Sequence, residues 1–135
     1  MGTYTADAVS LLVYLVDTLP QRADQIFTEA EAGETVIQAP STALAEALYS
    51  VARDKNVRGV TLTGTPEAAR QALVGNGPVS VAPVADEELI RYVRIVDAFN
   101  IHDALIVASH QAQGTDAIIT TDGVIQETGF ETVWK

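Results

Sequence analysis

Short runs of apolar and β-branched residues alternate along the chain with longer segments of helical periodicity. The predicted strands are residues 3–6, 35–39, 79–83, 117–120 and 131–134. The predicted helices are residues 10–19, 20–33, 42–54, 65–74, 86–99 and 103–113, and residues 55–64 are expected to form a loop. Strands that alternate with helices in this way are typical of an α/β domain with a mostly parallel sheet.

Turn and capping residues separate these segments. Ser41 and Thr42 are expected to cap the helix that follows them, and Asp103 to open the last long helix, because short polar side chains accept hydrogen bonds from first-turn amides. Gly114 should end that helix, since glycine adopts the left-handed conformation at little cost. We find no repeat and no linker, and we therefore expect a single domain over residues 1–135.

The helix of residues 86–99 has a clear apolar stripe. Leu89, Ile90, Val93 and Val96 recur at helical spacing, and we expect them to point into the core.

Net charge limits the class of partner. The 18 acidic and 8 basic residues give −10, which argues against non-specific attraction to nucleic acid or anionic membranes. A polyanionic substrate would therefore have to be held locally. Only Lys55 and Lys135 are lysine, and an acidic, lysine-poor surface suits a protein of halophilic origin, because concentrated salt screens its self-repulsion.

The absence of cysteine and the hydropathy of the chain exclude several kinds of site and segment. The chain has no cysteine, which removes disulfides, thiolate nucleophiles and Cys-ligated metal sites. The apolar stretch of residues 8–16 is too short to cross a bilayer and lacks the basic flank of a signal peptide. We expect a cytoplasmic protein without a membrane segment.

Four acidic residues are candidates for chemistry. Asp7 and Asp122 each follow a predicted strand, at the sheet edge where ligand crevices form. Asp103 enters a helix that is apolar nearly all round, and Glu46 lies about 150° from the apolar stripe of its own helix, at 100° per residue. Each also has an ordinary role open to it, as a cap, a turn residue or a solvated helix side chain. Their origin in four different elements favours a cluster formed by folding.

The residues around these acids resemble those of PIN-domain nucleases, and within them of VapC-type toxins. The resemblance rests on Asp7 after the first strand, Glu46 in Ser-Thr-Ala-Leu-Ala-Glu-Ala, Asp103 in Ile-His-Asp-Ala-Leu-Ile-Val-Ala, and Asp122 in Ile-Ile-Thr-Thr-Asp. It covers the whole chain in the family's order. It implies a three-layer α/β/α fold with a mostly parallel central sheet.

The resemblance also implies an activity and partners. The four acids would be the catalytic and metal-binding residues of an Mg²⁺- or Mn²⁺-dependent endoribonuclease. A symmetric homodimer and an antitoxin protein would be its partners, together with the RNA substrate. Hard oxygen ligands suit Mg²⁺ or Mn²⁺, and clustered carboxylates need cations or protons to neutralise them.

Other residues are weaker candidates. Thr120 matches the family's hydroxyl position before the last Asp and is expected to give supporting hydrogen bonds; its alternative role is that of a β-branched strand residue. The family often has a hydroxyl or amide two positions after the first Asp, where this chain has Val9. Ser10, one place further on, is the second candidate for a supporting role.

Basic residues gather at one place. Arg53, Lys55 and Arg58 concentrate three of the eight basic residues, and they could contact RNA phosphates or simply complement a helix C-terminus. His102 could touch substrate or lie at the surface.

Two other functions fit parts of the pattern. A receiver-like signalling domain would need an acidic pair after the first strand and a late lysine, whereas Asp7 has no acidic neighbour and Lys135 is the last residue. A catalytically silent PIN-fold interaction module remains open, although all four acids are present.

The acidic surface leads to a prediction about salt. If it is an adaptation to concentrated salt, the thermal midpoint should rise steadily as KCl increases from dilute to molar, because screening weakens the repulsion within a chain of charge −10. Thermal melts across that range measure the effect. A midpoint that stays flat or falls would mean that the charge balance has another cause.

Overall fold

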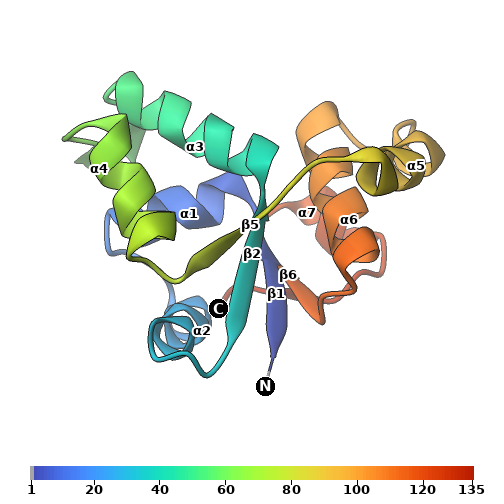
Figure 1. Ribbon diagram of the computed structural model, residues 1–135, viewed down its shortest axis with the longest axis horizontal. Helices are drawn as coiled ribbons and strands as arrows, with labels where there is room; N and C mark the ends of the chain where they lie inside the picture. The colour runs from blue at the N-terminus through green and yellow to red at the C-terminus, as the bar shows by residue number, and fades with distance from the viewer. Residues whose placement is uncertain (1) are drawn as a thin grey trace.

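The computed structural model describes residues 2–135 and contains a five-stranded sheet with the order β5-β2-β1-β6-β7. All of its pairings are parallel (Figure 1). The strands are β1 (Thr3–Ala6), β2 (Val36–Pro40), β5 (Val79–Ala82), β6 (Ala117–Ile119) and β7 (Thr132–Val133). The carboxyl ends of these strands therefore meet at one edge of the sheet.

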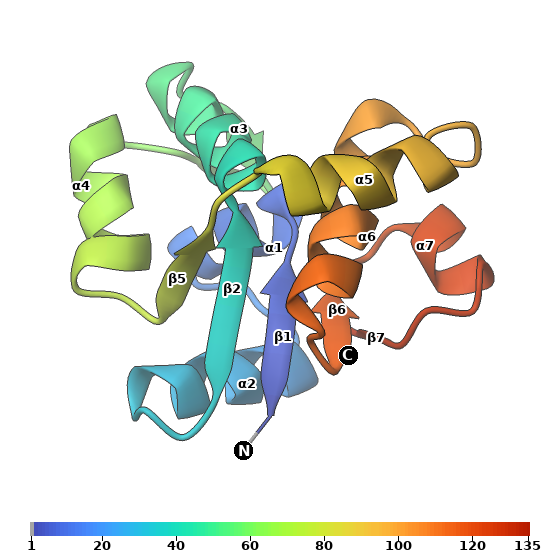
Figure 2. The same ribbon diagram turned by 45° about the vertical axis from the view of Figure 1, so that its right-hand side comes forward.

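Helices cover both faces of this sheet. One face carries α1 (Ala8–Leu15), α2 (Gln21–Glu31), α3 (Ser41–Ala52), α4 (Pro66–Arg70) and the π-helix η1 (Gln71–Gly75). The other carries α5 (Asp86–Ile95), α6 (Ile101–Gln113) and α7 (Gly123–Glu127) (Figure 2). The predicted three-layer α/β/α fold with a parallel sheet is confirmed.

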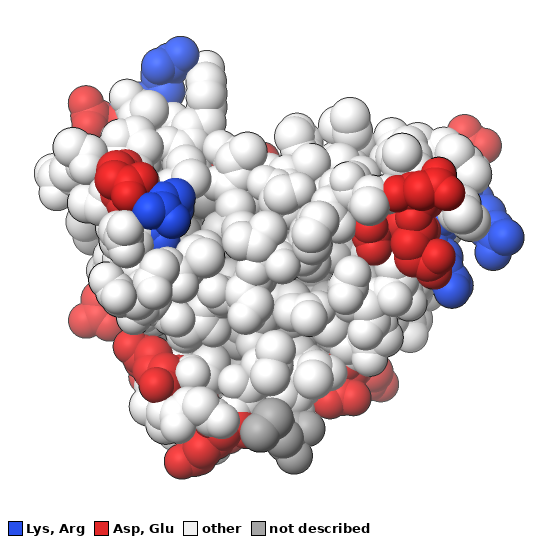
Figure 3. Space-filling view, viewed as in Figure 1, with Lys and Arg blue, Asp and Glu red and all other residues white. Residues whose placement is uncertain are grey.

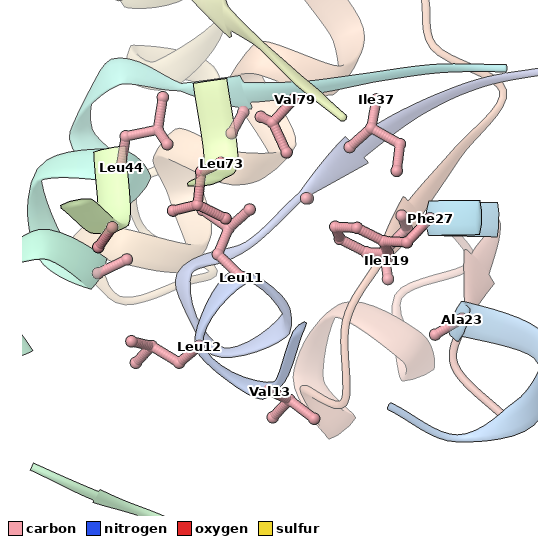
Figure 4. Close-up of a cluster of buried hydrophobic side chains, with 14 of the residues drawn as sticks. Leu11, Leu12, Val13, Ala23, Phe27, Ile37, Leu44, Leu73, Val79 and Ile119 are labelled. Atoms are coloured by element: carbon pink, nitrogen blue, oxygen red, sulfur yellow. The ribbon is translucent and has the colours of Figure 1, made fainter. Parts of the chain in front are cut away.

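Strand side chains alternate between two apolar clusters. Ile119 packs with Phe27 and Leu11 in the larger cluster (Figure 4). Its neighbour Ile118 packs with Val107 in the smaller one, on the α6 face. The larger cluster fixes α1 and α3 against the sheet, and the smaller one fixes α6 and α7. These are the helices that carry or follow the candidate acids.

A short polar chain attaches the end of α6 to β1. The hydroxyls of Thr5 and Thr115 are 2.8 Å apart, and Thr115 Oγ1 is 2.7 Å from His110 Nδ1. Burial lowers the pKa of His110, which keeps the ring neutral. Gly114 ends the helix as predicted, in the left-handed conformation with φ 66°.

Several predicted boundaries were wrong. The helix expected from residue 10 begins at Ala8, with Asp7 as its N-cap. Asp103 does not open α6, because that helix begins at Ile101 and the side chain of Asn100 caps it.

Ser41 and Thr42 do not cap α3 either, since α3 begins at Ser41 directly after Pro40. The Ser41 hydroxyl instead accepts a hydrogen bond from the amide of Val84 at 3.3 Å. The expected loop of residues 55–64 contains a small antiparallel hairpin, β3 (Asn56–Val57) with β4 (Val60–Thr61).

The inward face predicted for α5 was also wrong. Leu89, Ile90 and Val93 are 48%, 43% and 68% exposed, whereas Glu88 is only 3% exposed. The Glu88 carboxylate accepts hydrogen bonds from the amide of Ala85 at 2.8 Å and from the Gln113 side chain at 3.3 Å. The helix therefore packs on α6 through the side that carries Glu88 and the half-buried Ile95, and leaves Leu89, Ile90 and Val93 outside.

No helix within residues 2–135 combines the length and the hydropathy needed to cross a membrane.

Candidate functional site

Two of the candidate acids lie at the carboxyl edge of the sheet and cap helices there. Asp7 follows β1, and its Oδ1 accepts a hydrogen bond from the amide of Ser10 at 2.8 Å. Asp122 follows β6, and its Oδ1 accepts one from the amide of Ile125 at 3.0 Å. Because β1 and β6 are adjacent parallel strands, both carboxylates are brought to the same edge.

Thr120 connects these two acids. Its buried hydroxyl donates to Asp7 Oδ2 at 2.5 Å and accepts from the amide of Asp122 at 3.0 Å. The Ser10 hydroxyl donates to the Asp7 carbonyl oxygen at 2.8 Å, which supports the turn, and the Ser10 side chain also acts to lower the pKa of the Asp7 carboxyl. Thr120 therefore fixes one Asp7 oxygen and the backbone that carries Asp122.

Asp103, in the first turn of α6, lies close to Asp7 and Asp122. Asn100 Nδ2 donates to Asp103 Oδ2 at 3.0 Å, and the Asp103 amide donates to Asn100 Oδ1 at 2.9 Å. Partial burial, followed by the negative charges of Asp122 and Asp7, raises the pKa of Asp103 to about 6. Three carboxylates from three elements therefore interact at this site.

Burial also raises the pKa of Asp7, although hydrogen bonds from Thr120 and Ser10 act in the opposite direction. The site thus holds more negative charge than its surroundings neutralise. The N-termini of α1, α6 and α7 offset part of it, since Asp7 and Asp122 are N-caps and Asp103 lies in a first turn.

Glu46 completes the group from α3. Asp7, Glu46 and Asp103 line one pocket of about 70 Å³, together with Ala8, Val9, His102 and Ile106. Glu46 Oε2 is 3.4 Å from His102 Nδ1; the His102 side chain is largely exposed and that of Glu46 is about half-buried. The fold therefore brings all four candidate acids to one place, with Asp122 joined through its interaction with Asp103.

The donor set fits a hard divalent cation in its chemistry. The four acids supply only oxygen ligands, which suit Mg²⁺ or Mn²⁺. No three His, Cys, Asp or Glu side chains of residues 2–135 are arranged to hold an ion between them. Both oxygens of Asp7 accept a hydrogen bond, from Ser10 and from Thr120. Asp103 and Asp122 each have one oxygen that accepts a hydrogen bond. All three carboxylates keep further lone pairs.

The basic candidates lie outside the pocket. Arg53 stacks over the Tyr49 ring at 4.5 Å, and Arg58 over the Trp134 ring at 5.5 Å. Lys55 is exposed at the start of the hairpin. Arg53 is the C-cap of α3, seven residues after Glu46 and about 10 Å from it along the helix axis. Their contact with RNA stays a prediction.

Two larger hollows lie away from the acids. One of about 410 Å³ lies between α1, α3, the hairpin and α4, and its only titratable lining residue is Asp17. Another of about 280 Å³ lies between α3, η1 and β5 and is mostly apolar. By volume alone, these hollows would be better candidates for a functional site than the acidic pocket. Neither of them, however, brings together several groups that could transfer a proton or bind an ion.

Sequence reasoning missed Asn100. This residue caps α6 and also holds the Asp103 carboxylate. The signal was present, because an Asn three residues before an Asp is a typical pairing of an N-cap with the third helical position.

The repulsion at Asp103 predicts a pH effect on stability. Its pKa of about 6 in the folded chain exceeds the usual 3.8, so the folded state binds protons more tightly than the unfolded state does. In EDTA, the contribution of Asp103 should therefore fall as pH rises from about 4 to above 6. Asp103→Asn should then stabilise the chain at pH 7 by on the order of 1 kcal/mol, because solvent screens part of the repulsion.

Urea denaturation from pH 4 to 8 measures this difference. Asp97→Asn, at an exposed acid beyond α5, is the matched control and should show no such trend. An Asp103→Asn variant less stable than the parent at pH 7 would show that the carboxylates do not repel one another.

Comparison with known proteins finds the fold but no sequence family. No family model matches the chain, and no curated protein matches it significantly in sequence. Solved structures match it over nearly its whole length. The VapBC2 complex from Rickettsia felis, bound to a fragment of promoter DNA, aligns with a TM-score of 0.70 and 14% identity over 98% of this chain and 99% of that one.

Two further solved structures align with the chain over a similar length. VapC20 from Mycobacterium tuberculosis, described as a Sarcin-Ricin loop cleaving toxin, aligns with a TM-score of 0.68 and 18% identity over 98% of this chain and 99% of that one. The DNA-bound VapBC of Salmonella typhimurium aligns with a TM-score of 0.69 and 14% identity over 98% of both chains. The resemblance predicted from the acidic motifs is confirmed for the fold: this chain has the PIN-domain fold of VapC toxins.

Proposed function

We propose that the chain is a metal-dependent endoribonuclease that hydrolyses RNA phosphodiester bonds. The observation that carries the proposal is the convergence of Asp7, Glu46 and Asp103 from three elements on one small pocket, with Asp122 interacting with Asp103 beside it. Burial and then the charges of Asp122 and Asp7 raise the pKa of Asp103. An acid cluster of this kind costs stability unless a cation neutralises it. The fold shared with an RNA-cleaving VapC adds support.

The chain's own residues would prepare the site. Asp7, Glu46, Asp103 and Asp122 would hold Mg²⁺ or Mn²⁺, which when bound polarises the scissile phosphate and activates water for attack. Thr120 holds Asp7 by the hydrogen bond to its Oδ2, and Asn100 holds Asp103 in the same way. Asp7 and Asp103 are thus kept oriented before an ion arrives, which lowers the cost of assembling the site.

The biological role in this proposal is that of a toxin paired with an antitoxin protein. Two of the structural neighbours are complexes of VapB with VapC. No Lys or Arg lines the acidic pocket. A partner segment with an arginine would complement its charge and block it.

RNA cleavage is the direct test. In Mg²⁺ or Mn²⁺ the purified chain should cleave a single-stranded or structured RNA, EDTA should abolish the cleavage, and Asp103→Asn should reduce it at least ~100-fold, because a ligand and a charge are lost. Cleavage of a labelled RNA mixture, resolved on a sequencing gel, measures the rate.

Asp97→Asn is the control, since it removes an equal charge away from the pocket and should cleave normally. Cleavage that persists in EDTA, or full activity in Asp103→Asn, would contradict the proposal. A folded chain that cleaves no RNA under any of these conditions would instead favour a catalytically silent interaction module.

The exposed stripe of α5 supports a homodimer. Leu89, Ile90 and Val93 are exposed to solvent. The centre of the face seen in Figure 3 carries almost no charged side chain. Glu87 and Arg94 are seven residues apart and therefore lie on the same flank of the helix. When two copies of α5 pack antiparallel about a twofold axis, Glu87 of each copy lies opposite Arg94 of the other.

This arrangement predicts a charge-reversal result. The chain should be a dimer at tens of micromolar by light scattering, Glu87→Arg should weaken the dimer, and Glu87→Arg combined with Arg94→Glu should restore it. Val60→Asp, on the hairpin, is the control and should stay dimeric. A monomeric parent chain would contradict the proposed dimer.

A further inference from the structure

Tyr49 is the one aromatic residue within residues 2–135 that is exposed. It is 60% exposed and packs in neither apolar cluster. The other aromatic residues are buried or half-buried, as Phe27 and Trp134 are in the larger cluster. The Tyr49 ring therefore contributes nothing to the core, and an amphipathic ring held in water on a helix is typical of a binding surface.

The Arg53 guanidinium lies over this ring. Its Cζ is 4.5 Å from the centre of the Tyr49 ring, and side chains four residues apart are neighbours on a helix surface. Within residues 2–135 Arg53 forms no ion pair with an acidic side chain, whereas Arg70 pairs with Glu67 at 2.6 Å. Tyr49 and Arg53 thus present an aromatic ring and an unneutralised positive charge side by side, and we call them the α3 platform.

The α3 platform lies on the same side of α3 as Glu46, which lines the acidic pocket. Tyr49 follows Glu46 by three residues, about 4.5 Å along the helix axis and about 60° around it. Arg53 follows by seven residues, about 10 Å along the axis and about 20° around it. Figure 1 shows α3 leading from the carboxyl edge of the sheet away from α6. The platform therefore begins within one helical turn of a pocket residue and extends outward.

The size of the pocket decides which part of a substrate enters it. Its volume is about 70 Å³, whereas pockets that hold small organic ligands measure roughly 300–1,000 Å³. An ion and phosphate oxygens suit this space, and a nucleobase does not. The nucleotides on either side of a phosphate at the ion must therefore lie outside the pocket. The α3 wall of the pocket continues directly into the platform.

Charge gives the platform a role in holding RNA. The chain carries −10, and no Lys or Arg lines the pocket, so the RNA backbone needs a cation close by. Arg53 is such a cation. Aromatic rings and guanidinium groups also stack on bases of any sequence, provided that the bases are not already stacked within a duplex.

We infer that Tyr49 and Arg53 bind a nucleotide next to the scissile phosphate of single-stranded RNA, with its base stacked on Tyr49 and its phosphate in contact with Arg53. This inference rests on the proposed function. It assigns the pocket to the ion and the scissile phosphate, and the α3 platform to an unpaired neighbouring nucleotide. The stacking of Arg53 on Tyr49 in the free chain orients both groups before RNA arrives, which lowers the cost of binding.

The first test measures binding apart from cleavage. The probe is a short fluorescent single-stranded RNA whose anisotropy is followed in Ca²⁺, with a gel to verify that the RNA stays intact. Tyr49→Leu should raise Kd about tenfold, because leucine suits a helix but offers no ring for stacking. Tyr49→Phe keeps the ring, is the matched control and should bind like the parent chain. Thermal melts verify that every variant is folded.

Salt dependence separates a phosphate contact from a structural effect. Arg53→Gln should raise Kd, and the slope of log Kd against log KCl should fall by roughly 0.7, as expected when one phosphate contact to a single strand is lost. Arg22→Gln is the control, on α2 at the opposite end of the sheet (Figure 2). It removes the same charge and should leave the slope unchanged.

An abasic scan identifies the stacked base. RNAs that lack one base at a time keep the backbone, and one position next to the cleavage site mapped in Mn²⁺ should bind the parent chain about tenfold more weakly. Tyr49→Leu should lose no further affinity for that RNA. The inference would be overturned if Tyr49→Leu bound like the parent chain, if Tyr49→Phe weakened binding as much as Tyr49→Leu, or if the losses were additive at every position.

These outcomes also distinguish the inference from the proposed function. A chain that binds RNA through Tyr49 but cleaves none in Mg²⁺ or Mn²⁺ would overturn the proposed function and support the stacking contact. A chain that cleaves RNA while Tyr49→Leu and Arg53→Gln bind it as the parent does would overturn the inference alone.

Discussion

Repulsion among carboxylates gathered at one edge of a parallel sheet is the constraint on which the site of this protein depends. Asp7 and Asp122 are placed there by adjacent strands, and Asp103 by the helix that packs above them. In a chain of charge −10 nothing nearby neutralises them in full. The structure limits the cost with hydrogen bonds to each carboxylate and with three helix N-termini.

Each capping interaction therefore has two consequences. Asp7 and Asp122 stabilise the first turns of α1 and α7, and the same hydrogen bonds orient their remaining oxygens. This explains why the ordinary role that the sequence leaves open for these acids, as helix caps, does not compete with a role in chemistry. A carboxylate has lone pairs enough for both an amide and a cation.

The order of strands and helices could be predicted because apolar runs and turn residues record it locally. The orientation of α5 could not, since periodicity shows that Leu89, Ile90 and Val93 share a face but not whether that face meets the core. The prediction that Asp103 opens the helix was wrong for a similar reason. Asp and Asn are both common N-caps, and the structure has Asn100, three residues earlier, in that position. The resemblance predicts supporting hydrogen bonds from Thr120, but its partner Asp7 lies 113 residues away, so only the fold identifies that partner.

The outward position of the α5 stripe links these errors to function. Glu88 accepts hydrogen bonds inside from Ala85 and Gln113, and the half-buried Ile95 packs against the smaller apolar cluster. The helix is therefore held on α6 without Leu89, Ile90 and Val93, and these three side chains are left at the surface, where a second molecule can reach them.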